Sequence, residues 1–170
     1  MTKPVAILRS LAVAALVAML GLGAWAQDQP QGRVILEVTG AIAKTNADGA
    51  MRYDRAMLEA LGTREIVTRT PWTEGDIRFE GVLLRDVMAD VGATSTEVDA
   101  VALNDYTVTI PLIDAETHDV ILALKADGEI LTVRNRGPVW VIYPWNDDPD
   151  LRNEVYYSRS IWQLKALDVR

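Results

Sequence analysis

The sequence predicts an α+β domain built on a mixed or antiparallel β-sheet with a few short helices. Most patterned segments are short and rich in β-branched or alternating apolar residues, and they end at turn residues, which is typical of strands. Only two or three segments carry apolar residues at helical spacing. The chain shows no internal repeat or linker, and its apolar fraction of 49% is ordinary. Strands with a minority of short helices indicate the α+β class.

The predicted strands are apolar or alternating runs between turn signals. The clearest hairpin has Asp127-Gly128 between its strands, because this pair suits a two-residue type I′ turn. Trp140 and Tyr143 have opposite parity within one strand, so we expect at most one of these rings to face the core. The predicted strands cover residues 34–38, 65–70, 77–82, 98–103, 106–110, 120–125, 129–133, 139–143 and 161–169.

Caps and apolar spacing predict the helices. Asp54 can cap a short helix that ends at Gly62. A second helix is expected from Leu83 to Gly92, because apolar residues recur there at helical spacing. A further helical turn is expected to end near Tyr157.

The first 26 residues resemble a secretory signal peptide. Lys3 and Arg9 form a positive segment, an apolar run follows, and Ala24-Trp25-Ala26 suits signal peptidase cleavage. The alternative is an uncleaved membrane anchor, but the run is shorter than the roughly 20 apolar residues of a spanning helix. We therefore expect residues 27–170 to form a single periplasmic domain that does not insert into the membrane after cleavage.

Charge and composition exclude several function classes. The chain has 17 Lys and Arg against 24 Asp and Glu, a net charge of −7, and removal of Lys3 and Arg9 would make it more negative. This balance argues against nucleic acid and anionic membranes as partners. The absence of cysteine excludes cysteine nucleophiles, CxxC redox centres and iron–sulfur clusters. His118 is the only histidine, so no transition-metal site is expected.

Three stretches, in their order and spacing, resemble the sulfite-oxidase-type molybdopterin-binding family. They are residues 81–88 with Trp72 shortly before, residues 104–111 leading to residues 121–124, and residues 127–144. The resemblance extends over roughly Leu36 to Val169 and implies the sulfite-oxidase-type molybdopterin-binding fold. Two departures stand out. The cysteine that ligates molybdenum in catalytic members is missing near Thr68 to Thr70, and the chain is shorter than full catalytic domains.

The resemblance is closest to a small exported, cysteine-less branch of periplasmic pterin-binding proteins. It implies a non-catalytic protein that binds a reduced pterin or a molybdopterin-like pterin. Such a protein relays ligand occupancy to the periplasmic domain of a membrane-bound cyclic-di-GMP enzyme or sensor kinase. No metal cofactor is expected without the thiolate. The alternative is a molybdopterin-dependent oxidoreductase, or an accessory subunit of one.

A pterin site needs an aromatic face for stacking and polar groups in the plane of the ring. Trp72, in a loop after Pro71, and Tyr106 and Trp140 are the candidate faces. Trp162 alternates with Leu164, which favours the core over the ligand. The candidate polar residues are Arg136, which precedes Gly137-Pro138, Arg159, and Asp105. Each arginine could instead be a surface charge, and Asn104-Asp105 could be a simple Asx turn.

Overall fold

Two five-stranded β-sheets form the framework of the protein, and the computed structural model describes residues 29–170. The predicted signal peptide therefore lies outside the described residues. Within residues 29–170, no helix is both long and apolar enough to cross a membrane.

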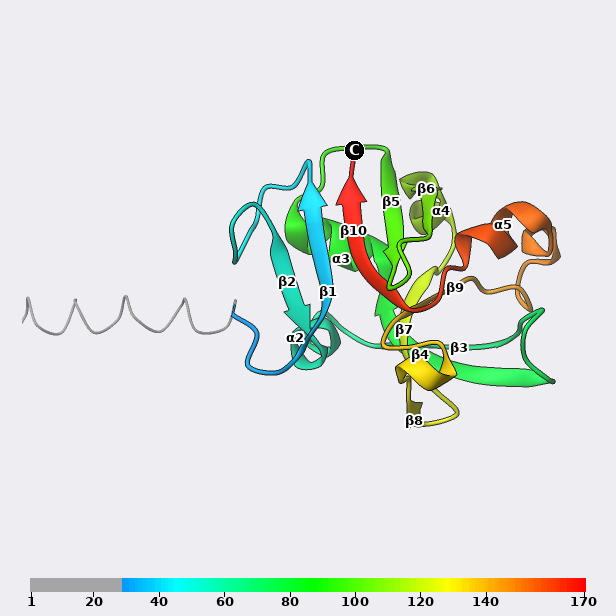
Figure 1. Ribbon diagram of the computed structural model, residues 1–170. Coiled ribbons are helices and arrows are strands. Elements are labelled where there is room, and N and C mark those ends of the chain that lie inside the picture. Colours follow the sequence, from blue (N-terminus) through cyan, green and yellow to red (C-terminus); the bar gives the residue numbers. More distant parts are fainter. Residues whose placement is uncertain (1–28) are drawn as a thin grey trace, which may run out of the picture.

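The first sheet joins the beginning of the described chain to its end. Its strand order is β2-β1-β10-β5-β6, and β1 and β10 run side by side and parallel (Figure 1). All other neighbours in this sheet are antiparallel. The strands are β1 (Val34–Gly40), β2 (Met51–Asp54), β5 (Glu97–Ala102), β6 (Thr107–Pro111) and β10 (Leu164–Val169).

The second sheet is antiparallel throughout, in the order β3-β4-β7-β8, with β9 also paired to β7. The backbones of β4 and β7 approach closely at Gly81, where a Cβ atom would lie 2.1 Å from the Leu122 carbonyl oxygen. The strands are β3 (Arg64–Arg69), β4 (Asp76–Leu83), β7 (Ile121–Ala126), β8 (Glu129–Ile130) and β9 (Trp140–Ile142).

Short helices fill the connections between strands. The apolar face predicted after Leu83 is buried in α3, and Gly92 ends the helix in the left-handed conformation with φ 61°. The α-helices are α2 (Arg55–Ala60), α3 (Leu84–Val91), α4 (Leu112–Thr117) and α5 (Glu154–Arg159). Two 3-10 turns, η1 (Val133–Asn135) and η2 (Pro149–Leu151), complete the elements. Mixed sheets with few short helices confirm the predicted α+β class.

The predicted hairpin around Asp127-Gly128 is present, but its second strand is shorter than expected. Asp127 and Gly128 both have positive φ, at 49° and 81°, as a type I′ turn requires. β8 stops at Ile130, because Leu131 turns into the core and Thr132 forms a capping box with Asn135 that starts η1. The loop from Leu131 to Pro138, called here the η1 loop, therefore replaces the expected strand.

The expectation that only one of Trp140 and Tyr143 faces the core is wrong. Trp140 is 1% exposed and Tyr143 is fully buried. The ring of Phe79 packs against Trp140 at 5.4 Å between centroids, and Tyr156 packs against Tyr143 at the same distance. Because other side chains cover both faces of this segment, strand parity does not separate core from solvent here.

Asp54 caps α2 as predicted and also fixes the segment before β1. Its oxygens accept backbone N–H groups from Met57 at 2.9 Å, Gln31 at 2.8 Å and Gly32 at 2.7 Å. Burial alone would raise the pKa of Asp54, but these hydrogen bonds to the carboxylate outweigh it and lower the pKa below its ordinary value of 3.8.

Asp54→Asn should therefore lower the free energy of unfolding by about 1–2 kcal/mol at pH 7. A lowered pKa stabilises the fold above the ordinary pKa, and this stabilisation is lost as the pH falls through the folded-state value. The difference between variant and parent should shrink in urea unfolding at acidic pH, below about pH 3. An unchanged difference would show that the carboxylate charge is not what the backbone N–H groups recognise.

Candidate functional site

A cluster of aromatic rings gathers where the two sheets and α5 meet. Trp72 lies at its centre, with ring centroids 5.3 Å from Trp162, 6.1 Å from Trp140, 6.2 Å from Tyr157 and 6.4 Å from Trp145. All four pairs are tilted or edge-to-face, which is a favourable geometry for aromatic rings. Trp140 and Trp145 are buried, so Trp72, Trp162 and Tyr157 form the accessible side of the cluster.

A pocket of about 330 Å³ opens over this accessible side, and we call it the aromatic pocket. This volume lies within the range of small-molecule sites. Among the described residues, Glu154, at the start of α5, is the only charged residue in its wall. The lining residues are Trp72, Ala102, Asn104, Tyr106, Glu154, Tyr157, Ser158, Ser160, Ile161 and Trp162.

Arg136 lies in the η1 loop and contacts the aromatic cluster. Its guanidinium lies 5.1 Å from the ring centroid of Trp140 and 6.0 Å from that of Trp162, and Nη2 donates to the Trp72 carbonyl oxygen at 2.9 Å. Arg136 and Gln163 both have positive φ, and the N–H of Gln163 donates to the Arg136 carbonyl at 2.9 Å. Asp105, beside two pocket residues, also has positive φ. Such sparsely populated conformations concentrate at functional sites.

A second hollow of about 480 Å³ shares Tyr157 with the aromatic pocket. Arg69, Arg152 and Trp145 are part of its wall. The buried Nε1 of Trp145 hydrogen bonds to no group of the described residues. Arg152 donates through Nε to the Trp145 carbonyl at 2.7 Å, while Arg69 pairs with Asp76 at 3.5 Å. This hollow is therefore more polar and more basic than the aromatic pocket.

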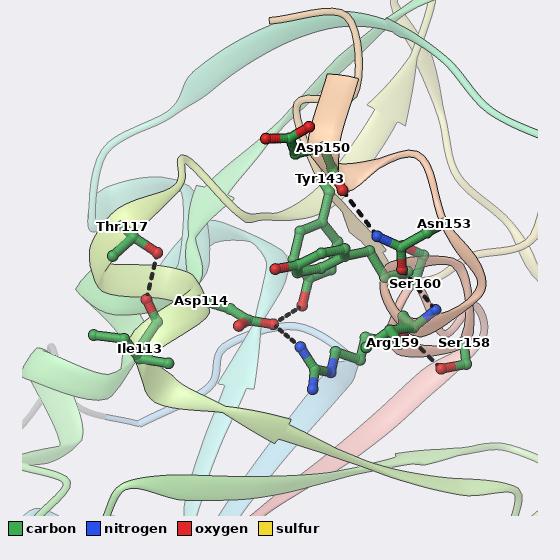
Figure 2. Close-up of polar contacts among 11 residues, drawn as sticks. Ile113, Asp114, Thr117, Tyr143, Asp150, Asn153, Ser158, Arg159 and Ser160 are labelled. Atoms are coloured by element: carbon green, nitrogen blue, oxygen red, sulfur yellow. Dashed lines mark hydrogen bonds and ion pairs between the residues drawn. The ribbon is translucent and has the colours of Figure 1, made fainter. Parts of the chain in front are cut away.

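A buried ion pair anchors α5, which forms one wall of the aromatic pocket. Figure 2 shows the Arg159 guanidinium and the Tyr143 hydroxyl reaching the same carboxylate oxygen of Asp114, each at 2.8 Å. Asp114 is 5% exposed and comes from α4. Burial raises the pKa of Tyr143 well above its ordinary value, and the Asp114 charge adds to this effect, so the hydroxyl remains a donor.

The structure brings some of the predicted site residues together. Trp72 and Tyr106 both line the aromatic pocket. Trp140 lies beneath it in the core, and Arg136 is tied to the cluster by contacts with Trp72 and Trp140. Gly137 does not leave room for a ligand, because a Cβ atom there would lie 2.4 Å from the Leu131 carbonyl carbon.

Two predicted polar residues have other partners. Arg159 pairs with Asp114 instead of lining the pocket. Asp105 has an 84% exposed side chain, and its carboxylate pairs with Lys165 at 2.6 Å. The Asn104 side chain accepts the Tyr106 N–H at 3.2 Å, so this segment is the Asx turn that was the alternative.

Several lining residues were missed from the sequence. Trp162 was assigned to the core, but β10 begins only at Leu164, and Trp162 is 39% exposed in the pocket wall. Glu154 and Tyr157 were also missed. Asn153 is the N-cap of α5, and its side chain accepts the Val155 N–H. This capping residue could have predicted where the helix starts, and Glu154 is the acidic residue of its first turn. No sequence signal places α5 against the loop that carries Trp72.

The described residues do not fit a thiolate-ligated molybdenum. In place of the expected cysteine, Thr68 is fully buried and its hydroxyl accepts the Asn146 N–H at 3.1 Å. The Thr70 hydroxyl is bonded to the Thr73 hydroxyl at 2.9 Å and accepts the Trp72 N–H. Both hydroxyls are occupied, and hydroxyl is not the soft donor that such a site uses. Residues 29–170 contain no group of three or more His, Asp or Glu that could hold a metal ion.

Comparisons with known proteins agree with this fold. The sulfane dehydrogenase SoxCD from Paracoccus pantotrophus is similar in structure, with a TM-score of 0.57 and 15% sequence identity. The match covers 80% of this chain and 38% of that chain, so the present chain corresponds to well under half of the SoxCD chain. At this identity the likeness shows the fold alone. The curated proteins give no match to the sequence.

The sequence pattern described as "Oxidoreductase molybdopterin binding domain" matches residues 45–146, which is more than half of the chain. The match spans the segment from before β2 to beyond β9, including Trp72 and the η1 loop. The two-sheet fold agrees with this match, and the match establishes that this chain belongs to the oxidoreductase molybdopterin-binding domain family.

Proposed function

We propose that this protein binds an uncharged reduced pterin in the aromatic pocket and is not a redox enzyme. The observation that carries the proposal is the combination of an accessible aromatic wall with the loss of the metal ligand. Trp72, Tyr157 and Trp162 offer ring faces and edges to a flat heterocycle. The threonines at the position of the family's cysteine support ligand binding without metal chemistry.

The charge of the pocket supports a pterin without a phosphorylated tail. A pterin presents an amide and amino edge that donates hydrogen bonds, and Glu154 is the charged acceptor in the wall. Asn104, Ser158 and Ser160 add polar groups. No lysine or arginine of residues 29–170 lines the pocket to neutralise a phosphate. Glu154 thus takes the role that the sequence analysis gave to Asp105.

Calorimetric titration with tetrahydrobiopterin tests this proposal. Trp72→Ala should weaken binding roughly tenfold, because it removes a stacking face, and Trp72→Phe should retain part of the affinity. Glu154→Gln should also weaken binding roughly tenfold by removing a charged acceptor. Glu129→Gln, with the same charge change on exposed β8, is the matched control and should bind like the parent. Equal binding by Glu154→Gln and the parent would contradict the assigned acceptor.

The proposal also includes a signalling role for the ligand-bound protein. An exported protein without a catalytic metal would act by presenting its ligand-bound state to the periplasmic domain of a membrane-bound cyclic-di-GMP enzyme or sensor kinase. Export and the periplasmic location are part of this proposal and rest on the sequence of the first 26 residues. The single domain over residues 27–170 is also proposed, and it rests on the length of that segment. N-terminal sequencing of protein recovered from the periplasm should begin at Gln27.

The residues that line the second hollow favour the alternative function, in which the protein binds an intact molybdopterin cofactor. Arg69, although it pairs with Asp76 in the same wall, could recognise a phosphorylated tail together with Arg152 and the Trp145 N–H, which has no partner among the described residues. Metal analysis of protein from its native host separates the two functions. About one molybdenum per chain would contradict the non-catalytic proposal, and a fluorescent pterin without molybdenum would support it.

A further inference from the structure

A third hollow, of about 480 Å³, lies beside the η1 loop and is unusual for an acidic protein. Three arginines, Arg33, Arg55 and Arg134, contribute to its wall, and no aspartate or glutamate of the described part of the chain does. Its remaining lining residues are Ile35, Leu131, Thr132, Val133 and Pro138. We call this surface the arginine groove. It shares no lining residue with the aromatic pocket.

These guanidinium groups are not neutralised within the described part of the chain. None of the three arginines forms an ion pair with a carboxylate of residues 29–170, whereas Arg64 and Arg78 pair with Asp119 and Glu65. Within residues 29–170, Arg55 donates only to the Leu124 carbonyl oxygen, at 3.1 Å.

Asp54, the neighbour of Arg55 in the sequence, does not neutralise the positive charge of the arginine groove either. Asp54 is 3% exposed, and its oxygens are occupied by the backbone N–H groups of Gln31, Gly32 and Met57. It is absent from the groove wall. The arginines therefore carry hydrogen-bond donors and positive charge that the described residues leave available to another molecule.

The groove also has an apolar part. Val133 is 48% exposed, and Ile35 and Pro138 are half-buried beside it. Guanidinium groups around an apolar wall suit a chain that alternates carboxylates with apolar side chains, because the arginine fork matches carboxylate geometry. The overall charge of −7 does not prevent this, since charges beyond about 8–10 Å are largely screened at physiological ionic strength.

We propose that the arginine groove is a docking surface for an acidic segment of a partner protein, with aspartate or glutamate side chains on the arginines and an apolar side chain on Val133. The chain's own first 28 residues do not suit this role, because they carry Lys3 and Arg9 against a single acid, Asp28. The proposal does not depend on the ligand of the aromatic pocket.

Fluorescence anisotropy with a labelled hexapeptide of alternating glutamate and leucine tests the proposal on the purified protein. The peptide should bind, and the matching glutamine and leucine peptide should not. Raising NaCl from about 50 mM to about 500 mM should weaken binding, because exposed charge pairs are screened. The double substitution Arg33→Glu and Arg134→Glu should weaken binding at least about fivefold. Arg33→Gln with Arg134→Gln gives a second test if charge reversal impairs folding.

The matched control is the double substitution Arg64→Glu and Arg78→Glu. The side chains of Arg64 and Arg78 are 52% and 57% exposed and belong to β3 and β4. Their double substitution changes the net charge by the same amount as the double substitution in the groove. The control should bind the peptide like the parent. Equal losses in both double variants, or no loss in the groove variants, would overturn the proposal. Displacement of the peptide by millimolar inorganic phosphate would overturn it too, by identifying a small-oxyanion site.

Discussion

Gly81→Ala should lower the free energy of unfolding by about 3 kcal/mol or more and leave much of the protein insoluble. A Cβ atom at this position would lie 2.1 Å from the Leu122 carbonyl oxygen and 2.6 Å from the Ala123 Cα. Both neighbours are backbone atoms of β7 and cannot turn away as a side chain could. The methyl group would therefore push apart β4 and β7, which are adjacent strands in the middle of the second sheet.

Gly128→Ala is the matched control for this prediction. Gly128 has φ 81°, so alanine is conformationally strained there, but a Cβ atom would meet no atom within 4 Å. Its expected cost is about 1 kcal/mol. Urea unfolding of both variants separates steric conflict from backbone strain. If the two substitutions cost the same, the close approach of β4 and β7 is not what requires glycine at position 81.

Arg159→Ala should lower the free energy of unfolding by about 3 kcal/mol and weaken ligand binding in the aromatic pocket. Without the guanidinium, the Asp114 carboxylate stays buried with the Tyr143 hydroxyl as its only partner among the described residues. The pair is well shielded, since the side chains of Arg159 and Asp114 are 20% and 7% exposed. The same change releases the end of α5, the helix that carries Glu154 and Tyr157.

The ion-pair prediction is checked by thermal unfolding and by pterin titration on the same variants. Arg159→Lys keeps the charge and should recover part of the stability. Arg159→Ala combined with Asp114→Ala should cost less than the sum of the single changes, because neither buried charge is then left alone. Additive costs in this double-mutant cycle would mean that Arg159 and Asp114 stabilise the protein independently of each other.

Local features of the fold could be predicted from the sequence, because their causes are local. The Asp54 cap, the buried face of α3 and the Asp127-Gly128 turn all depend on residues within a few positions of each other. The burial of both Trp140 and Tyr143 could not be predicted in this way. It depends on Phe79 and Tyr156, which reach β9 and its end from distant parts of the chain.

The residues of the candidate site could likewise be predicted only in part. Trp72, predicted in a loop, and Tyr106, predicted at the start of a strand, were candidate aromatic faces, and both line the pocket. Arg159 has the residue type expected of a ligand donor, but its partner Asp114 lies 45 residues away, and only the three-dimensional structure brings the two together. Glu154 was missed because nothing in the sequence places α5 against the loop that carries Trp72.

The parallel pairing of β1 with β10 has a consequence for how the molecule reaches its fold. β10 separates β1 from β5 in the first sheet, and Thr39 bonds to Asp168 across a sequence distance of 129 residues. Until Val169 has been synthesised, β1–β2 and β5–β6 remain two separate ribbons. Such distant contacts make folding slow relative to helical proteins of the same size. Deleting the six residues of β10 would therefore remove an interior strand of the first sheet and not a dispensable tail.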